Sequence, residues 1–182
     1  QRWLVTDDTL YFQGKDNTHG FEPWHSDGTP DGTEMISDFN AASNSAIPPA
    51  KATLFGDKIF FTAQANGLGQ EPYISDGTPE GTFLLSDINP NGESSYPSVM
   101  GILGDTLIFS AYEPIGGREL WRTDGTAEGT EQIAELVPGN SNTWTSYATP
   151  IGGVIYFAGE DDEGVHPWKT DGTLAGTEKI MT

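Results

Sequence analysis

The stretch that decides the fold is SDGTPDGTEM, which runs from Ser26 to Met35 and places two Gly-Thr pairs four residues apart. Close variants return three times, as SDGTPEGTFL from Ser75, TDGTAEGTEQ from Thr123 and TDGTLAGTEK from Thr170. The aspartates of the four copies are spaced 49, 48 and 47 residues apart, at Asp27, Asp76, Asp124 and Asp171. A spacing this regular indicates an internal repeat.

Two further landmarks keep the same period. An apolar triplet recurs as Leu10-Tyr11-Phe12, Ile59-Phe60-Phe61, Leu107-Ile108-Phe109 and Ile155-Tyr156-Phe157. An aromatic residue precedes each aspartate by three positions, at Trp24, Tyr73, Trp121 and Trp168. We therefore divide the chain into four copies of one unit, approximately 1–40, 41–90, 91–137 and 138–182, within a single repeat domain.

The third copy predicts four strands in succession. YPSVMGIL and TLIFSAY are rich in β-branched and aromatic residues, and Gly104-Asp105 between them is a two-residue hairpin turn. RELWRT and TEQIAEL supply a third and a fourth strand, with EPIGG as the loop before the third. No stretch keeps a 3.6-residue apolar period, so we expect almost no helix.

Four antiparallel strands repeated every 40 to 50 residues are typical of a β-propeller blade. One small sheet cannot bury both of its faces, whereas sheets packed face to face cover one another. We therefore predict an all-β propeller of four four-stranded antiparallel blades closed into a disc. The alternative is a fragment or half of a larger propeller. The short first copy and the start at Gln1 suit a trimmed first strand, a mature product or an excised fragment.

The repeated phrase has the composition of a hairpin loop between the third and fourth strands. In Thr78-Pro79-Glu80-Gly81, proline suits the second turn position and the acid the third. We expect Gly81 to take the left-handed conformation that follows. Ala127 and Leu174 stand in place of the proline in copies three and four, and a type I turn tolerates both.

The aspartate of the phrase has three interpretations. A short carboxylate before a glycine-containing loop accepts hydrogen bonds from loop N–H groups, which makes it a structural staple. Its oxygens also suit calcium. Catalysis fits poorly, because four copies would mean four equivalent active sites. We favour the staple for the Asp-Gly-Thr residues Asp27, Gly28, Thr29, Asp76, Gly77, Thr78, Asp124, Gly125, Thr126, Asp171, Gly172 and Thr173.

The wider motif resembles a known repeat family. The third copy reads ELWRTDGTAEGT, and the others read EPWHSDGTPDGT, EPYISDGTPEGT and HPWKTDGTLAGT. This is similar to the ELWxxDGTxxGT repeat of bacterial secreted and surface proteins. The Glu-Leu-Trp part is complete only in the third copy. The resemblance implies a secreted or cell-surface tandem-repeat protein and does not define a ligand. The loop also resembles the Asp-box of sialidase-like propellers, where the motif is structural.

Other residues are candidates for ligand binding. The third strand is preceded by an acid at Glu22, Glu71 and Glu119, and by His166 in the last copy. These side chains either pair with backbone or a neighbouring blade, or line a site for a cation. The acidic loop GEDDEG makes Asp161 and Asp162 candidate calcium ligands, although it lacks the alternating spacing of an EF-hand. Trp144 is a candidate stacking platform for a sugar, with inter-blade packing as the alternative.

Charge and composition exclude several classes of partner. The chain of 182 residues has 8 Lys+Arg against 27 Asp+Glu, which gives a net charge of −19. Such a surface repels nucleic acid, which requires cationic side chains to displace counterions. Since there is no cysteine, disulfides, thiolate metal sites and cysteine nucleophiles are excluded. No apolar run approaches the roughly 18 residues that span a bilayer, so we expect no membrane insertion.

We expect a non-enzymatic extracellular module for protein interaction or self-assembly, with homo-oligomers as one outcome and no cofactor beyond calcium. A carbohydrate-binding propeller is the first alternative, and a propeller hydrolase is the second. Function should lie where the copies differ, in the loops 15–20, 64–69, 112–117 and 159–164 and at Trp144.

Overall fold

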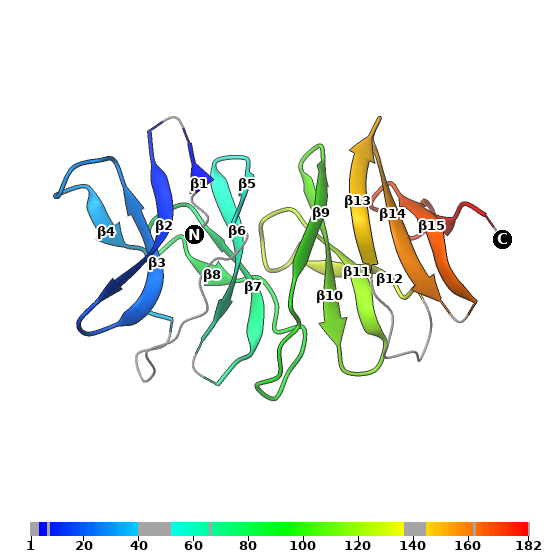
Figure 1. Cartoon of the computed structure of the whole chain (residues 1–182), viewed down its shortest axis with the longest axis horizontal. Coiled ribbons are helices and arrows are strands. Elements are labelled where there is room, and N and C mark those ends of the chain that lie inside the picture. Colours follow the sequence, from blue (N-terminus) through cyan, green and yellow to red (C-terminus); the bar gives the residue numbers. More distant parts are fainter. Residues whose placement is uncertain are drawn as a thin grey trace. The chain divides into compact units, whose positions relative to one another are not determined.

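The structure is a computed structural model that describes residues 4–6, 8–39, 52–65, 67–136, 145–161 and 163–181. These residues form sixteen strands in four antiparallel sheets of four strands each (Figure 1). Helix is absent from these ranges, so they contain no helix that could span a bilayer. The predicted all-β class is confirmed.

Each sheet is a meander of four consecutive strands and lies within one of the four sequence copies. Sheet 1 contains β1 (Leu4–Val5), β2 (Leu10–Asp16), β3 (Gly20–Ser26) and β4 (Thr33–Met35). Sheet 2 contains β5 (Thr53–Phe55), β6 (Lys58–Gln64), β7 (Gln70–Ser75) and β8 (Phe83–Leu84). Sheet 3 contains β9 (Ser98–Leu103), β10 (Thr106–Glu113), β11 (Gly117–Thr123) and β12 (Glu131–Ala134). Sheet 4 contains β13 (Thr145–Ile151), β14 (Val154–Asp161), β15 (Gly164–Thr170) and β16 (Glu178–Lys179).

The chain divides into two compact units, Gln1–Ser94 with sheets 1 and 2, and Ser95–Thr182 with sheets 3 and 4.

The strands of sheet 3 lie close to where the sequence predicts them. Gly104 begins the turn between β9 and β10 with a φ of 59°, which agrees with the expected Gly-Asp hairpin.

The two faces of each sheet are distinguished by the apolar triplet. We call the face that carries the middle residue the forward face (Tyr11, Phe60, Ile108 and Tyr156), and the opposite face the backward face. The two alternate because successive side chains of a strand point to opposite sides.

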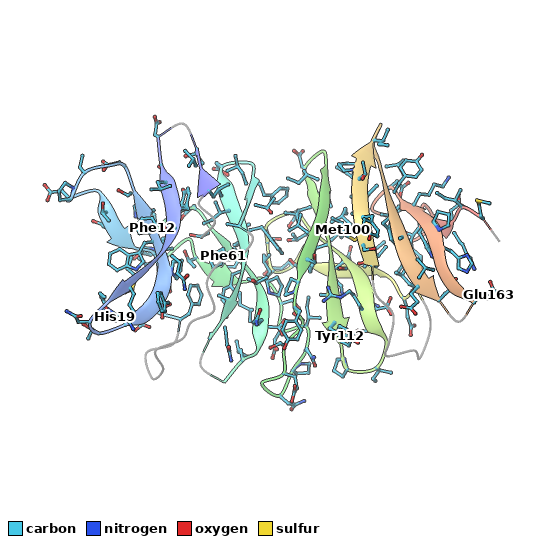
Figure 2. All side chains as sticks on the ribbon, viewed as in Figure 1. Phe12, His19, Phe61, Met100, Tyr112 and Glu163 are labelled. Atoms are coloured by element: carbon cyan, nitrogen blue, oxygen red, sulfur yellow. The ribbon has the colours of Figure 1, made fainter. Side chains whose placement is uncertain are left out.

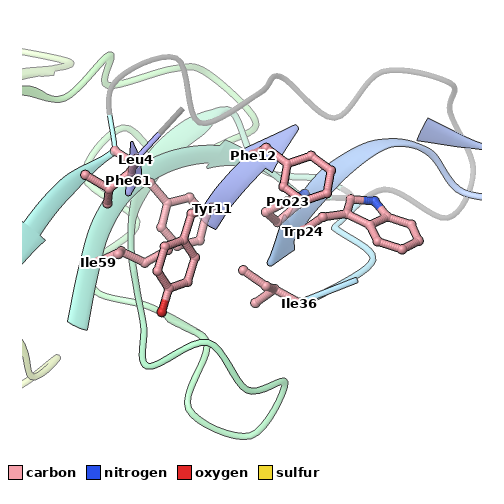
Figure 3. A pocket seen from close by; sticks show the side chains of 9 residues that line it. Leu4, Tyr11, Phe12, Pro23, Trp24, Ile36, Ile59 and Phe61 are labelled. Atoms are coloured by element: carbon pink, nitrogen blue, oxygen red, sulfur yellow. The ribbon is translucent and has the colours of Figure 1, made fainter. Parts of the chain in front are cut away.

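In the first unit, the forward face of sheet 1 packs on the backward face of sheet 2. Tyr11 lies against a buried cluster that includes Phe39, Ile59, Phe61 and Tyr73. The Phe39 ring meets the rings of Phe61 and Tyr73 edge-on, with centroids 5.8 and 4.9 Å away. Between the two sheets an apolar cavity of about 10 Å³ remains (Figure 3). It is too small and too apolar to serve as a ligand site.

The second unit repeats this arrangement. Ile108 and Leu120 on the forward face of sheet 3 pack against Ile155 and Phe157 on the backward face of sheet 4. Phe157 stacks on Trp168, with ring centroids 6.4 Å apart. In both units, therefore, a forward face is covered by the backward face of the sheet that follows in the sequence.

Candidate functional site

The four Asp-Gly-Thr loops share one hydrogen-bond network. In the first copy, both the backbone N–H and the hydroxyl of Thr29 donate to Asp27 Oδ1, at 2.8 and 2.7 Å. The same two bonds join the other three pairs, Asp76–Thr78, Asp124–Thr126 and Asp171–Thr173. The carboxylate thus orders the loop that follows it, as an Asx-turn does.

The remaining polar groups of the phrase close the network. The N–H of Gly32 donates to the Thr29 hydroxyl at 3.0 Å, and the Thr33 hydroxyl donates to the Thr29 carbonyl at 2.6 Å. Ser26 Oγ lies 2.7 Å from Thr33 Oγ1 and accepts from the N–H of Gly28 at 3.0 Å. Equivalent bonds recur in the other copies. Both Gly-Thr pairs of the phrase therefore serve the loop itself.

The two glycines of the loop have different roles from those expected. The left-handed residue is the glycine directly after the aspartate, with a φ of 92° at Gly28 and 94° at Gly77. The second glycine does not have a positive φ. The prediction that Gly81 adopts the left-handed conformation is therefore wrong. Gly81 is instead required by space, because a methyl group there would lie 2.0 Å from Asp76 Oδ1.

Three of the loop carboxylates have a lowered pKa, which favours their charged form. Hydrogen bonds from the Thr side chain and then from the Thr backbone N–H lower the pKa of Asp27, Asp76 and Asp171. A carboxyl with a lowered pKa is a poor general acid at neutral pH.

A second repeated feature is a set of fully buried glutamates. Glu22, Glu71 and Glu119 are 0% exposed. One oxygen of each, Oε2, accepts a backbone N–H from the segment that follows the fourth strand, from Phe39 at 3.1 Å, Ile88 at 3.1 Å and Leu136 at 2.5 Å. Burial raises the pKa of Glu119 to about 8. The glutamate thus ties the exit segment of its sheet to the third strand.

The fourth copy replaces this glutamate with His166, beside the acidic loop. His166 Nε2 lies 3.4 Å from Asp161 Oδ1. The Lys179 ammonium lies 2.8 Å from both Asp161 Oδ2 and Glu163 Oε2, and Glu163 occupies the turn between β14 and β15 (Figure 2). Asp161, Glu163 and His166 are close enough to one another to ligate a metal. A cation there would have to displace Lys179, whose hydrogen bond lowers the pKa of Asp161.

Two residues proposed from the sequence lie outside the described residues, the calcium candidate Asp162 and the sugar-stacking candidate Trp144. Their roles stay predictions.

The sequence did not predict the uncovered forward face of sheet 4. Tyr156 is 40% exposed there, whereas its equivalents Phe60 and Ile108 are 1% and 0% exposed. Together with Tyr147, Val165 and His166 it borders a shallow, solvent-open depression of about 430 Å³. Tyr147 is 85% exposed and has a φ of 57°, within an irregularity of β13 between Ser146 and Thr149. A bulky residue in the left-handed region is strained, and such strain is concentrated at functional sites.

Comparison with known proteins identifies the fold. No protein-family model matches the sequence, and no curated protein matches it significantly. Among solved structures, the chain is similar to the β-propeller domain of the Trilobed protease from Pyrococcus furiosus, with a TM-score of 0.58 at 14% identity. The match covers 100% of this chain and 54% of the protease chain. The chain has a β-propeller fold, and its four sheets are the blades.

Two larger proteins share this similarity. A mutant of puromycin hydrolase matches 95% of the chain with a TM-score of 0.60 at 12% identity. Oligopeptidase B from Leishmania major matches 99% of it with a TM-score of 0.61 at 11% identity. The chain spans only 27% and 26% of their respective lengths. At these identities the similarity shows the fold alone.

Proposed function

We propose that this propeller is a non-enzymatic module for protein interaction and self-assembly outside the cell. The observation that carries the proposal is the open forward face of sheet 4. Tyr156 is 40% exposed where Ile108 of sheet 3 is fully covered by another sheet. An apolar face bordered by polar groups is typical of a protein interaction site.

The chemistry of the repeated carboxylates supports a non-enzymatic role. In each Asp-Gly-Thr loop, one carboxylate oxygen of the aspartate, Oδ1, accepts two hydrogen bonds from its own loop. Glu119 has the raised pKa that suits a general acid, but it is 0% exposed and hydrogen-bonded to the backbone of Leu136. A substrate therefore has no route to that carboxyl group in this conformation.

An extracellular location is supported by the resemblance to the ELWxxDGT repeats. The chain also carries a net charge of −19. The same charge disfavours nucleic acid as a partner. The resemblance supports bacterial secreted and surface proteins as the class to which the chain belongs.

Self-association tests the proposal directly. Sedimentation equilibrium or multi-angle light scattering over increasing protein concentration should show a weight-average mass that rises above the 19.6 kDa of one chain. A mass that stays at one chain up to millimolar concentration, together with no capture of partner proteins from a cell-surface fraction, would overturn it.

Carbohydrate binding is a second candidate, favoured by the pair of exposed tyrosines at the depression. Tyr147 and Tyr156 offer aromatic faces for a sugar ring at this depression. A glycan array should then give binding that is lost in Tyr147→Ala and Tyr156→Ala. An array without a binding glycan would remove this candidate and leave the interaction module.

A further inference from the structure

The two packed sheet pairs share one contact in detail. In the first unit, a methyl group placed on Gly77 would lie 3.3 Å from the Tyr11 hydroxyl oxygen. In the second unit, a methyl group on Gly172 would lie 3.2 Å from Ile108 Cδ1. The middle residue of the triplet in one sheet therefore packs over the Asp-Gly-Thr glycine of the next sheet.

Among the described residues, one glycine and one triplet residue of this repeated contact have no partner, Gly28 of sheet 1 and Tyr156 of sheet 4. A methyl group on Gly28 would meet no atom within 4 Å, and Gly28 is exposed while Gly77, Gly125 and Gly172 are buried. At the other end of the sequence, Tyr156 is exposed on its forward face. Tyr156 occupies the same repeat position as Tyr11, which packs over Gly77.

A polar contact accompanies the apolar one. Arg122 on the forward face of sheet 3 pairs with Glu131 and donates to the carbonyl of Gly172 at 3.1 Å. Lys169 stands at the same repeat position in sheet 4, and its ammonium is held 2.8 Å from Glu178 Oε1. Arg122 of sheet 3 thus reaches the Asp-Gly-Thr loop of the next sheet. Lys169 offers a cation at the same position on the forward face of sheet 4.

We propose that the forward face of sheet 4 docks the Asp27-Gly28-Thr29 hairpin and the backward face of sheet 1 of a second copy of this chain. Tyr156 packs over Gly28 of the second copy, and Lys169 approaches the carbonyl of Gly28 and the exposed Asp27 carboxylate. This interface continues the sheet-to-sheet packing already present twice in the chain. It is heterologous, so its repetition gives a ring or a filament. The inference rests on the proposed self-assembly and names the surface that performs it.

Charge-matched variants test the surface. Tyr156→Arg and Val165→Arg place a cation on the proposed face, and Ile115→Arg places the same charge on a side chain that is 78% exposed in the β10–β11 loop. The first two should weaken self-association at least tenfold, the loss typical of a residue at the centre of an interface. Ile115→Arg should associate like the parent chain. Circular dichroism verifies that each variant is folded, and Val165→Arg keeps the test decisive if Tyr156→Arg does not fold.

Cysteine cross-linking identifies the occupant, because the chain contains no cysteine. A mixture of two single variants, Lys169→Cys and Pro30→Cys, should form a disulfide-linked heterodimer on mild oxidation in preference to either homodimer. Pro30 is exposed, and Ala127 and Leu174 show that other side chains fit its place. Association that persists unchanged in Tyr156→Arg and Val165→Arg would overturn this interface and leave the proposed function intact. A chain that carries both Lys169→Cys and Pro30→Cys is a further test. If it stays monomeric and forms the disulfide within one chain, docking of a second copy is overturned. Absence of self-association in the parent chain would overturn this interface, and only together with no capture of partner proteins from a cell-surface fraction would it also overturn the proposed function.

Discussion

The two glycines of each Asp-Gly-Thr hairpin are required for different physical reasons. Gly125 has a φ of 89°, a conformation that glycine adopts without strain. Gly129 lies so close to the preceding carboxylate that a methyl group would be 2.1 Å from Asp124 Oδ1. The first glycine is therefore fixed by its backbone, and the second by the approach of a side chain that holds the loop.

Replacing Gly129 with alanine should consequently destabilise the second unit. The new methyl group displaces the Asp124 carboxylate and breaks its bonds to Thr126, at a cost of about 1–3 kcal/mol in the free energy of unfolding. Urea denaturation measures the loss. The exposed neighbour Glu128→Ala is the control and should change the midpoint little. Equal effects of the two variants would contradict the steric argument.

The buried Glu119 should make stability depend on pH. Its pKa is about 8 in the folded chain against 4.5 for an unperturbed glutamate, so the folded state keeps a proton that the unfolded state loses. This contribution is complete below about pH 4.5 and is lost as the pH rises toward 8, by at most about 1.4 kcal/mol per pH unit.

The variant Glu119→Gln isolates that contribution, because its amide does not titrate. Between about pH 5 and pH 8, the free energy of unfolding of the parent chain should fall relative to that of Glu119→Gln. Chemical denaturation at several pH values supplies the curves, with the exposed Glu128→Gln as the control that should run parallel to the parent. Parallel curves for Glu119→Gln would show that the carboxyl titrates normally.

At the scale of the strand, β13 contains an exposed aromatic residue with a strained backbone, Tyr147. Tyr147 combines a φ of 57° with 85% exposure, so it gains little from burial in exchange for its unfavourable backbone. Replacement by glycine removes the strain, although it also frees the unfolded chain. We expect Tyr147→Gly to change the free energy of unfolding by less than about 1 kcal/mol in either direction. Thermal denaturation tests this, and a loss of several kcal/mol would mean that the tyrosine supports the sheet.

Much of the element structure follows from the sequence. Each of the four Asp-Gly-Thr phrases lies between the third and fourth strands of one sheet, as its residue pattern predicts, and Gly104-Asp105 separates β9 from β10 as expected. The misplaced left-handed glycine has a simple cause. The residue pattern of Thr78 to Gly81 fits a standard turn, and nothing in it shows that the Asp76 carboxylate folds back over Gly81.

The open face could not be predicted, because it depends on which sheets are covered. Tyr156 and Ile108 occupy the same repeat position and are both apolar enough for a core. Only the packing of the sheets shows that one is buried and the other exposed. The burial of Glu22, Glu71 and Glu119 could not be predicted either, because an acidic residue at the start of a strand is usually solvated.

For the whole molecule, the dominant property is the net charge of −19. Two such chains repel each other at low ionic strength, and salt screens this repulsion within a Debye length of about 10 Å at 0.1 M. Self-association should therefore strengthen as sodium chloride rises from roughly 50 to 500 mM. Sedimentation velocity measures the change. Association that weakens with salt would indicate that ion pairs such as Lys169 with Asp27 dominate the interface over its apolar part.

The completion of every sheet by consecutive strands has a mechanical consequence. No strand of one sheet is borrowed from another copy among the described residues, so no sheet needs a distant segment to finish folding. Tension applied to the two ends of such a chain should extend it in discrete steps, one repeat at a time, and each released segment should refold from its own hairpins.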